Sequence, residues 1–331
     1  METHRTTMSL GCFGTLLSFS ARVLMLVFLL FTAPQAFAQG KEPGMLQQNT
    51  AYRKVQVDGL SIFYREAGPK DAPPILLLHG LPSSSRMFEP LFARISDRFH
   101  LIAPDYPGFG HSDAPDPKQF AYTFDHIATI MEHFTEKIGL THYTLYMQDY
   151  GGPVGFRLFT ENSEKVKGLI IQNANAYMEG VGDAPKKVLL PLWDKRTPET
   201  EKPAREFVSL EGTKFHWLVG AKDPEAINPD NWILDQALLD RPGVQDYQVD
   251  LLEDYKSNIA LYPEWQAAFR AHRPRTLIAW GKKDPFFVPP GAEAYLRDLP
   301  EAKLIWLDAG HFVLDENVHI VADEIKAVFG R

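Results

Sequence analysis

Cysteine is almost absent from this sequence, which has one such residue, Cys12, among 331. One thiol cannot form an intrachain disulfide, and it cannot supply the several thiolates of a structural zinc site. The sequence contains 45% hydrophobic residues, a proportion typical of a globular protein with a sizeable core. We therefore expect the fold to be held by core packing, without a metal.

Positive charge is also in short supply. The chain has 34 Lys and Arg residues against 42 Asp and Glu residues, which gives a formal net charge of −8 at pH 7. Such a surface repels phosphate backbones, and no stripe of basic residues appears along the chain. We expect no nucleic-acid partner.

The apolar run near the N-terminus is short of the roughly 20 residues that a membrane span needs. It covers 23–31, follows Arg22 and precedes a small-x-small cleavage pattern at 36–38. We interpret residues 1–38 as a secretory signal peptide, with Met8 as an alternative start and a retained membrane anchor as the alternative interpretation. We expect an exported protein, periplasmic or secreted, with no membrane association after signal cleavage.

Two alternating segments flank Asp58-Gly59 and predict a β-hairpin, because this pair is typical of a type I′ turn. The pattern then changes to short continuous apolar runs, separated by stretches of helical spacing such as 124–138 and 152–160. Runs of this kind indicate parallel strands covered on both faces. The four runs are Ile75–Leu78, Leu101–Ala103, Tyr143–Met147 and Leu169–Ile171.

Residues 176–262 interrupt this rhythm. They are rich in Pro, Trp, Asp and Glu, and they show helical spacing without a strand pattern. Within these residues, helical spacing occurs at 201–209, 231–239 and 246–260. After them the alternation of strand and helix resumes, with strands expected at 276–280 and 303–307 and helices near 291–298 and from about 317. We predict an α/β fold in which a core of residues 39–175 and 263–331 is interrupted by a helical cap at 176–262.

Asp149 stands at a sharp turn between a strand and a helix. The apolar run 143–147 precedes it, and Gly151 and Gly152 follow it, as the close approach of helix and strand at such a turn requires. The serine motif known for such turns, G-x-S-x-G, occurs nowhere in the chain. Ligands bind beyond the carboxyl ends of strands in doubly wound sheets, so we predict Asp149 as a site residue.

Several strand ends together resemble a known family. They are His79-Gly80-Leu81-Pro82, Asp105 to His111, Gln148 to Gly152, Gly281 to Asp284, and Gly310-His311. Over roughly 52–175 and 274–331 the chain resembles the α/β-hydrolase fold, in its branch of haloalkane dehalogenases and epoxide hydrolases. The resemblance implies a mostly parallel central sheet, helices on both faces and an inserted helical cap.

By the resemblance, the turn at Asp149 is the nucleophile elbow and Asp149 is the nucleophile. A carboxylate nucleophile selects the chemistry of such a site. It is ionised near neutrality and attacks sp3 carbon to give a covalent alkyl-enzyme ester, which water must then hydrolyse. By the resemblance, His311 would activate that water and Asp284 would orient the imidazole. The backbone N–H groups of Leu81 and Tyr150 would form the oxyanion hole. His79 is expected to hold the turn that presents Leu81, without a catalytic role.

The residue after the nucleophile departs from the family pattern. Haloalkane dehalogenases place a tryptophan there, whose indole N–H holds the departing halide, whereas this chain has Tyr150. Epoxide hydrolases instead protonate the leaving alkoxide from cap tyrosines. Tyr255 lies at about the family's distance before the strand that leads to Asp284, and we predict it as the donor. Packing of Tyr255 on the inner face of a cap helix is the alternative.

A second cap donor is not obvious from the sequence. His216 and Trp217 stand where one is expected, and they could equally donate to a halide or line an apolar pocket. Tyr177 is a further candidate.

We therefore predict a cofactor-independent hydrolase that attacks sp3 carbon, with an epoxide hydrolase favoured and a haloalkane dehalogenase as the alternative. An ester or lactone hydrolase ranks lower, because a carboxylate that attacks an acyl carbon would give an anhydride. A non-catalytic ligand-binding protein is the remaining alternative. The aromatic cap predicts a small to medium apolar substrate, and the oligomeric state cannot be predicted from the sequence.

Overall fold

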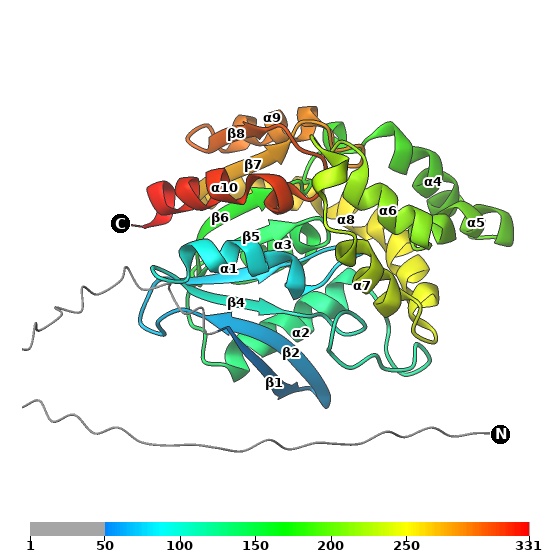
Figure 1. The fold of residues 1–331 in the computed structure, drawn as a ribbon, viewed down its shortest axis with the longest axis horizontal. Coiled ribbons are helices and arrows are strands. Elements are labelled where there is room, and N and C mark those ends of the chain that lie inside the picture. Colours follow the sequence, from blue (N-terminus) through cyan, green and yellow to red (C-terminus); the bar gives the residue numbers. More distant parts are fainter. Residues whose placement is uncertain (1–49, 331) are drawn as a thin grey trace, which may run out of the picture. The chain divides into compact units, whose positions relative to one another are not determined.

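The computed structural model describes residues 50–330, which form an eight-stranded sheet with helices on both faces (Figure 1). The strand order is β1-β2-β4-β3-β5-β6-β7-β8. The strands are β1 (Ala51–Val57), β2 (Leu60–Ala67), β3 (Pro74–Leu78), β4 (His100–Pro104), β5 (Tyr143–Gln148), β6 (Val166–Gln172), β7 (Arg275–Gly281) and β8 (Lys303–Leu307). The predicted signal peptide, residues 1–38, lies outside the described residues.

The predicted hairpin and the predicted parallel strands are both confirmed. β1 and β2 pair in antiparallel fashion around Asp58 and Gly59, whose φ angles of 49° and 85° are those of a type I′ turn. β2 also pairs antiparallel with β4, and every later pairing, from β4–β3 to β7–β8, is parallel. The carboxyl ends of the parallel strands therefore share one edge of the sheet, where a site is expected.

Helices cover the two faces of the sheet and bury a separate apolar cluster on each. On one face α1 (Glu89–Ile95) packs against α10 (Val313–Phe329), and both lie in front of the sheet in Figure 1. On the other face lie α2 (Phe124–Lys137), α3 (Gly151–Glu161) and α9 (Pro289–Asp298). α10 begins four residues before the predicted start at 317, and its non-helical Asn317 (φ −124°) marks a kink between its first turn and the rest.

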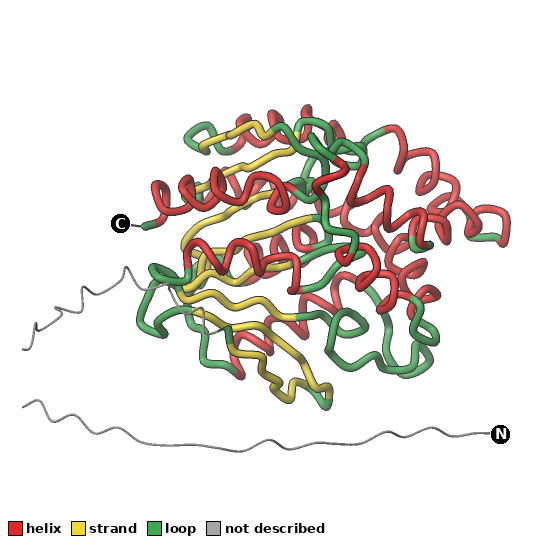
Figure 2. Tube along the Cα trace, viewed as in Figure 1, coloured by secondary structure: helices red, strands yellow, loops and turns green. Residues whose placement is uncertain are grey.

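Five helices join β6 to β7, and Figure 2 shows this region as helix and loop without strand. They are α4 (Asp183–Asp194), α5 (Pro198–Phe207), α6 (Leu210–Leu218), α7 (Asp230–Leu239) and α8 (Val244–His272). The predicted division between cap and core at 262 falls inside α8, which continues through Pro263 because Trp265 and Phe269 pack on Phe156 of α3. Between residues 50 and 330, no helix has the length and hydropathy to cross a membrane.

Candidate active site

The turn after β5 holds Asp149 in a constrained backbone conformation. Its φ is 52°, in the left-handed region that residues with a Cβ rarely occupy. The following helix approaches β3 so closely that a Cβ at Gly151 would lie 2.0 Å from the carbonyl oxygen of Leu78. Gly80 is equally constrained, because a Cβ there would lie 2.2 Å from Oδ1 of Asp149. The backbone therefore places the carboxylate at the carboxyl edge of the sheet.

The Asp149 carboxylate is 7% exposed and is held by backbone donors. The N–H of Leu81 donates to its Oδ1 at 2.7 Å. Burial raises the pKa of Asp149 to about 6, while His311 and the backbone N–H groups of Leu81 and Tyr150 oppose this rise. The two N–H groups that were predicted to form an oxyanion hole thus converge on the carboxylate of Asp149.

The structure brings Asp284 and His311 to the same place. Nδ1 of His311 lies 2.8 Å from Oδ2 of Asp284, and Nε2 lies 3.8 Å from Oδ2 of Asp149. The backbone N–H groups of Phe286 and Phe287 donate to the other Asp284 oxygen at 2.7 and 3.1 Å. These contacts fix the carboxylate in place, so it can orient the imidazole.

Two amide side chains next to this triad were not predicted. Asn173, directly after β6, donates from Nδ2 to Oδ2 of Asp284 at 2.7 Å and accepts the N–H of Gly281 at 2.9 Å. Nε2 of Gln148 lies 2.7 Å from Nε2 of His311. Gln148 ends β5 directly before Asp149, which is a sequence signal that could have found it, whereas Asn173 follows a strand that carries no predicted catalytic residue.

The contact of Gln148 defines the protonation of His311. Because Nδ1 faces the Asp284 carboxylate, it carries the proton of a neutral imidazole. An amide nitrogen can only donate, so Gln148 donates to the lone pair on Nε2. In this arrangement Nε2 of His311 is a proton acceptor, as a general base requires.

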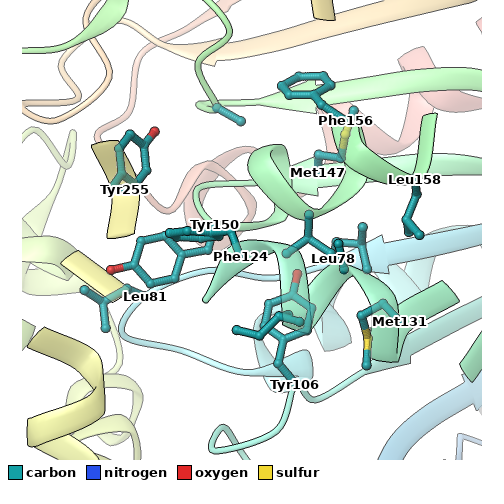
Figure 3. Close-up of a cluster of buried hydrophobic side chains, with 14 of the residues drawn as sticks. Leu78, Leu81, Tyr106, Phe124, Met131, Met147, Tyr150, Phe156, Leu158 and Tyr255 are labelled. Carbon is teal, nitrogen blue, oxygen red and sulfur yellow. The ribbon is translucent and has the colours of Figure 1, made fainter. Parts of the chain in front are cut away.

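A small cavity of about 50 Å³ lies between the cap and the turn that bears Asp149. Phenol groups enter it from both sides, Tyr150 from the turn and Tyr255 from α8, with their ring centroids 6.3 Å apart. Figure 3 shows both rings beside Leu81 at one side of the buried cluster. Both hydroxyls are buried, neither makes a well-formed hydrogen bond among the described residues, and Tyr262 lies beside that of Tyr255. Burial raises the pKa of each phenol well above its usual value, so both keep their protons.

Two of the suggested cap donors are not at the cavity. The indole N–H of Trp217 donates to Oδ2 of Asp235 at 2.9 Å, and its ring stacks on Phe312, so the prediction of Trp217 as a leaving-group ligand is not supported by its position. The Tyr177 hydroxyl donates to Asp298 at 2.6 Å. Neither residue is part of the cavity lining.

His216 does line the cavity, but as an acceptor. Its Nδ1 lies 2.7 Å from the carbonyl oxygen of Gly212, so this nitrogen carries the proton. Burial and the neighbouring His311 lower the pKa of His216 to about 3, so the ring is neutral and Nε2 has only a lone pair. His79 lies outside the cavity lining, stacked on Tyr106, whose hydroxyl donates to the His79 carbonyl.

A family model described as the alpha/beta hydrolase fold matches residues 73–318. The chain belongs to the alpha/beta hydrolase fold family. Among the similar members of this family is the uncharacterized hydrolase YNR064C of Saccharomyces cerevisiae, which is 36% identical over 85% of this chain and 97% of its own length. A cis-3-alkyl-4-alkyloxetan-2-one decarboxylase of Xanthomonas campestris pv. campestris is 27% identical over 82% of this chain and 93% of its own.

Within the alpha/beta hydrolase fold family, the chain resembles the haloalkane dehalogenases. Haloalkane dehalogenase 2 of Mycobacterium tuberculosis is 38% identical over 30% of this chain and 35% of its own length. The crystal structure of haloalkane dehalogenase DbeA from Bradyrhizobium elkani superposes with a TM-score of 0.69 at 21% identity, over 85% of this chain and 99% of that one. The predicted fold class and the hydrolase class are therefore both confirmed.

Proposed function

We propose that this hydrolase opens an epoxide through a covalent ester on Asp149. The observation that supports this proposal most directly is the pair of phenols, Tyr150 and Tyr255, which line the same cavity as the carboxylate of Asp149. An alkoxide leaving group needs a proton, and a neutral phenol of raised pKa keeps its proton until the alkoxide forms.

In the first step, a carboxylate oxygen of Asp149 bonds to a ring carbon while the ring C–O bond breaks, and a phenol protonates the alkoxide. In the second step, His311 takes a proton from water as the hydroxide adds to the ester carbonyl. The N–H groups of Leu81 and Tyr150 stabilise the oxyanion. The departing diol oxygen takes the proton from His311, and the carboxylic proton of Asp149 restores the phenol.

A haloalkane is the second candidate, because named relatives are haloalkane dehalogenases. A halide needs N–H or O–H donors but no proton. The indole of Trp217 is engaged by Asp235, so the donors at the cavity are the two phenols and the amide of Asn175. A lactone is the third candidate, since one relative is named for a reaction of an oxetan-2-one, a strained cyclic ester.

The His311→Gln variant tests the proposal. With the general base removed, the ester should form and persist, and the intact protein should gain the mass of one substrate molecule. Incubation with short epoxides and with 1-haloalkanes identifies the leaving group, because a haloalkane adduct lacks the oxygen that an opened epoxide retains. Peptide mapping should place the adduct on Asp149, and the Asp149→Ala variant is the control without an adduct.

Two results would contradict the proposal. Full turnover by His311→Gln would remove His311 from the mechanism. For the wild-type enzyme in ¹⁸O-water, label should enter the Asp149 carboxylate over several turnovers, because hydrolysis occurs at the ester carbonyl. Turnover without label in Asp149 would favour direct attack of water, and no turnover or adduct across the panel would favour a binding protein.

A further inference from the structure

Two hollows of very different size meet beside the candidate active site. The inner cavity, of about 50 Å³, contains Asp149 and the two phenols. An outer groove, of about 670 Å³, lies between α4, α5 and α6. Phe207, at the end of α5, and His216, on α6, line both hollows. These two side chains therefore form the boundary between the reacting groups and the outer groove.

The inner cavity limits what can sit against Asp149. A cavity of roughly 150 Å³ takes up one benzene molecule, and one water needs at least about 10–15 Å³. A cavity of about 50 Å³ therefore has room for a three-membered ring and little more. Any longer substituent must leave the inner cavity, and the shared boundary at Phe207 and His216 leads to the larger volume.

The outer groove suits an apolar chain. Its lining includes Val188 of α4, Pro203 of α5 and Phe215 of α6, with charged Lys187, Glu206 and Glu211 among the other lining residues. Phe215 is 39% exposed, so its ring faces water until something covers it. Alkyl groups gain about 0.8 kcal/mol per buried CH₂, which makes this aromatic surface a favourable place for a hydrocarbon tail.

We infer that the preferred substrates are terminal epoxides with one unbranched apolar chain. The ring occupies the inner cavity, and the chain reaches the outer groove by parting Phe207 and His216, whose rings form an edge-to-face pair with centroids 5.9 Å apart. The inner cavity of about 50 Å³ leaves no room for a second substituent on the far ring carbon, so epoxides substituted at both carbons are poor substrates. This inference rests on the proposed epoxide hydrolysis and adds to it the shape of the substrate.

Chain length is the variable that tests the inference. For wild-type enzyme, kcat/KM should rise about two- to fourfold per added methylene from 1,2-epoxybutane to 1,2-epoxyoctane, mainly through a lower KM. The Phe207→Trp variant narrows the boundary and should lower the ratio of kcat/KM for the long over the short epoxide at least tenfold. The Phe215→Glu variant adds a negative charge to the outer groove and should lower the same ratio. It tests the outer groove independently of the Phe207→Trp variant.

Leu234→Glu is the matched control. Leu234 lies on α7, is 48% exposed and lines neither hollow, so this variant should keep the wild-type ratio. An unchanged ratio in both test variants, or a wild-type preference for a trans-2,3-disubstituted epoxide, would overturn the inference. Ester formation from 1,2-epoxybutane tests the proposed function separately, because that small substrate does not depend on the outer groove.

Discussion

The negative charge of Asp149 acts on His311 across 3.8 Å. Burial by itself would lower the pKa of His311, but the carboxylates of Asp284 and Asp149 together raise it above its ordinary value. Once Asp149 becomes a neutral ester, its contribution disappears and the pKa of His311 falls. In the proposed mechanism, ester formation would therefore generate the neutral base that the second step needs.

The two steps should consequently differ in their pH dependence. Ester formation should slow as the pH falls through about 6, because the protonated form of Asp149 does not attack. Ester hydrolysis should persist at pH values below the pKa that His311 has in the free enzyme, because esterification of Asp149 lowers this pKa. Single-turnover rates, measured by mass spectrometry and compared with an NMR titration of the His311 imidazole, check this. The prediction would be contradicted if the acid limb of ester hydrolysis lay at or above the pKa measured for His311 in the free enzyme.

Gln148 should also control the titration of His311. The Gln148→Glu variant replaces an amide donor with a carboxylate at the same place, and this charge stabilises the imidazolium. The acid limb of ester hydrolysis should move to higher pH, and hydrolysis at pH 7 should slow about tenfold, a part of the roughly 10²–10⁴-fold that a general base contributes. Ester formation should change less. Gln56→Glu, at an exposed position of β1, should leave the pH profile unchanged.

The sequence was informative at residues whose place follows from the end of a strand. Asp149, Asp284 and His311 could be brought together in advance because parallel strands end at one edge. The role of Asn173 could not, since its amide acquires meaning only from the Asp284 oxygen beside it. The direction of Trp217 depends on which face of α6 meets Asp235, and a short aromatic cap helix carries no pattern that decides it.

At the scale of elements, Asp235 joins the cap to the core. This buried residue of α7 accepts hydrogen bonds from Ser83 and Arg86, which follow β3, and from Trp217 of α6. Burial raises its pKa to about 6, although Arg86 opposes the rise. One carboxylate therefore connects two cap helices to the segment that carries Leu81.

Removing this carboxylate should loosen the cap. Asp235→Ala leaves the indole of Trp217 without an acceptor and removes the charge that pairs with Arg86, whose guanidinium keeps only Asn231 as an acceptor. Loss of one partner of a buried pair costs about 3–5 kcal/mol. Because the Arg86 side chain is 20% exposed, we expect about 2–4 kcal/mol in urea unfolding. Asp194→Ala, at an exposed position of α4, should change stability by less than about 0.5 kcal/mol. If Asp235→Ala lowered the free energy of unfolding by as little as this control, the role of Asp235 in joining the cap to the core would be contradicted.

Helices and strands could be predicted where the spacing of apolar residues along the sequence follows one clear period. The hairpin and the parallel strands carry a clear alternation or a continuous apolar run. α1 was missed because its seven residues follow a 3-10 turn and are too few to show a helical period. The helical spacing predicted at 246–260 stops short of the end of α8 at His272. Pro263 normally ends a helix, and the aromatic packing beyond it is a tertiary effect.

At the scale of the whole molecule, the cysteine content suits the proposed export into an oxidising compartment. Cys12 lies within the proposed signal peptide, so the mature protein would contain no thiol. In an oxidising compartment, a chain without cysteine cannot form incorrect or intermolecular disulfides while it folds.

Expression of the full chain in a Gram-negative host should therefore yield a protein that begins at Gln39. The small residues Ala36 and Ala38 fit the positions that a signal peptidase recognises, and Arg22 precedes the apolar run as a positive flank does. N-terminal sequencing of the periplasmic or secreted protein checks the cleavage site. Ala38→Arg should block cleavage and leave the precursor associated with the membrane, whereas Gln39→Asn should be processed normally. A cytoplasmic protein that begins at Met1 or Met8 would contradict export.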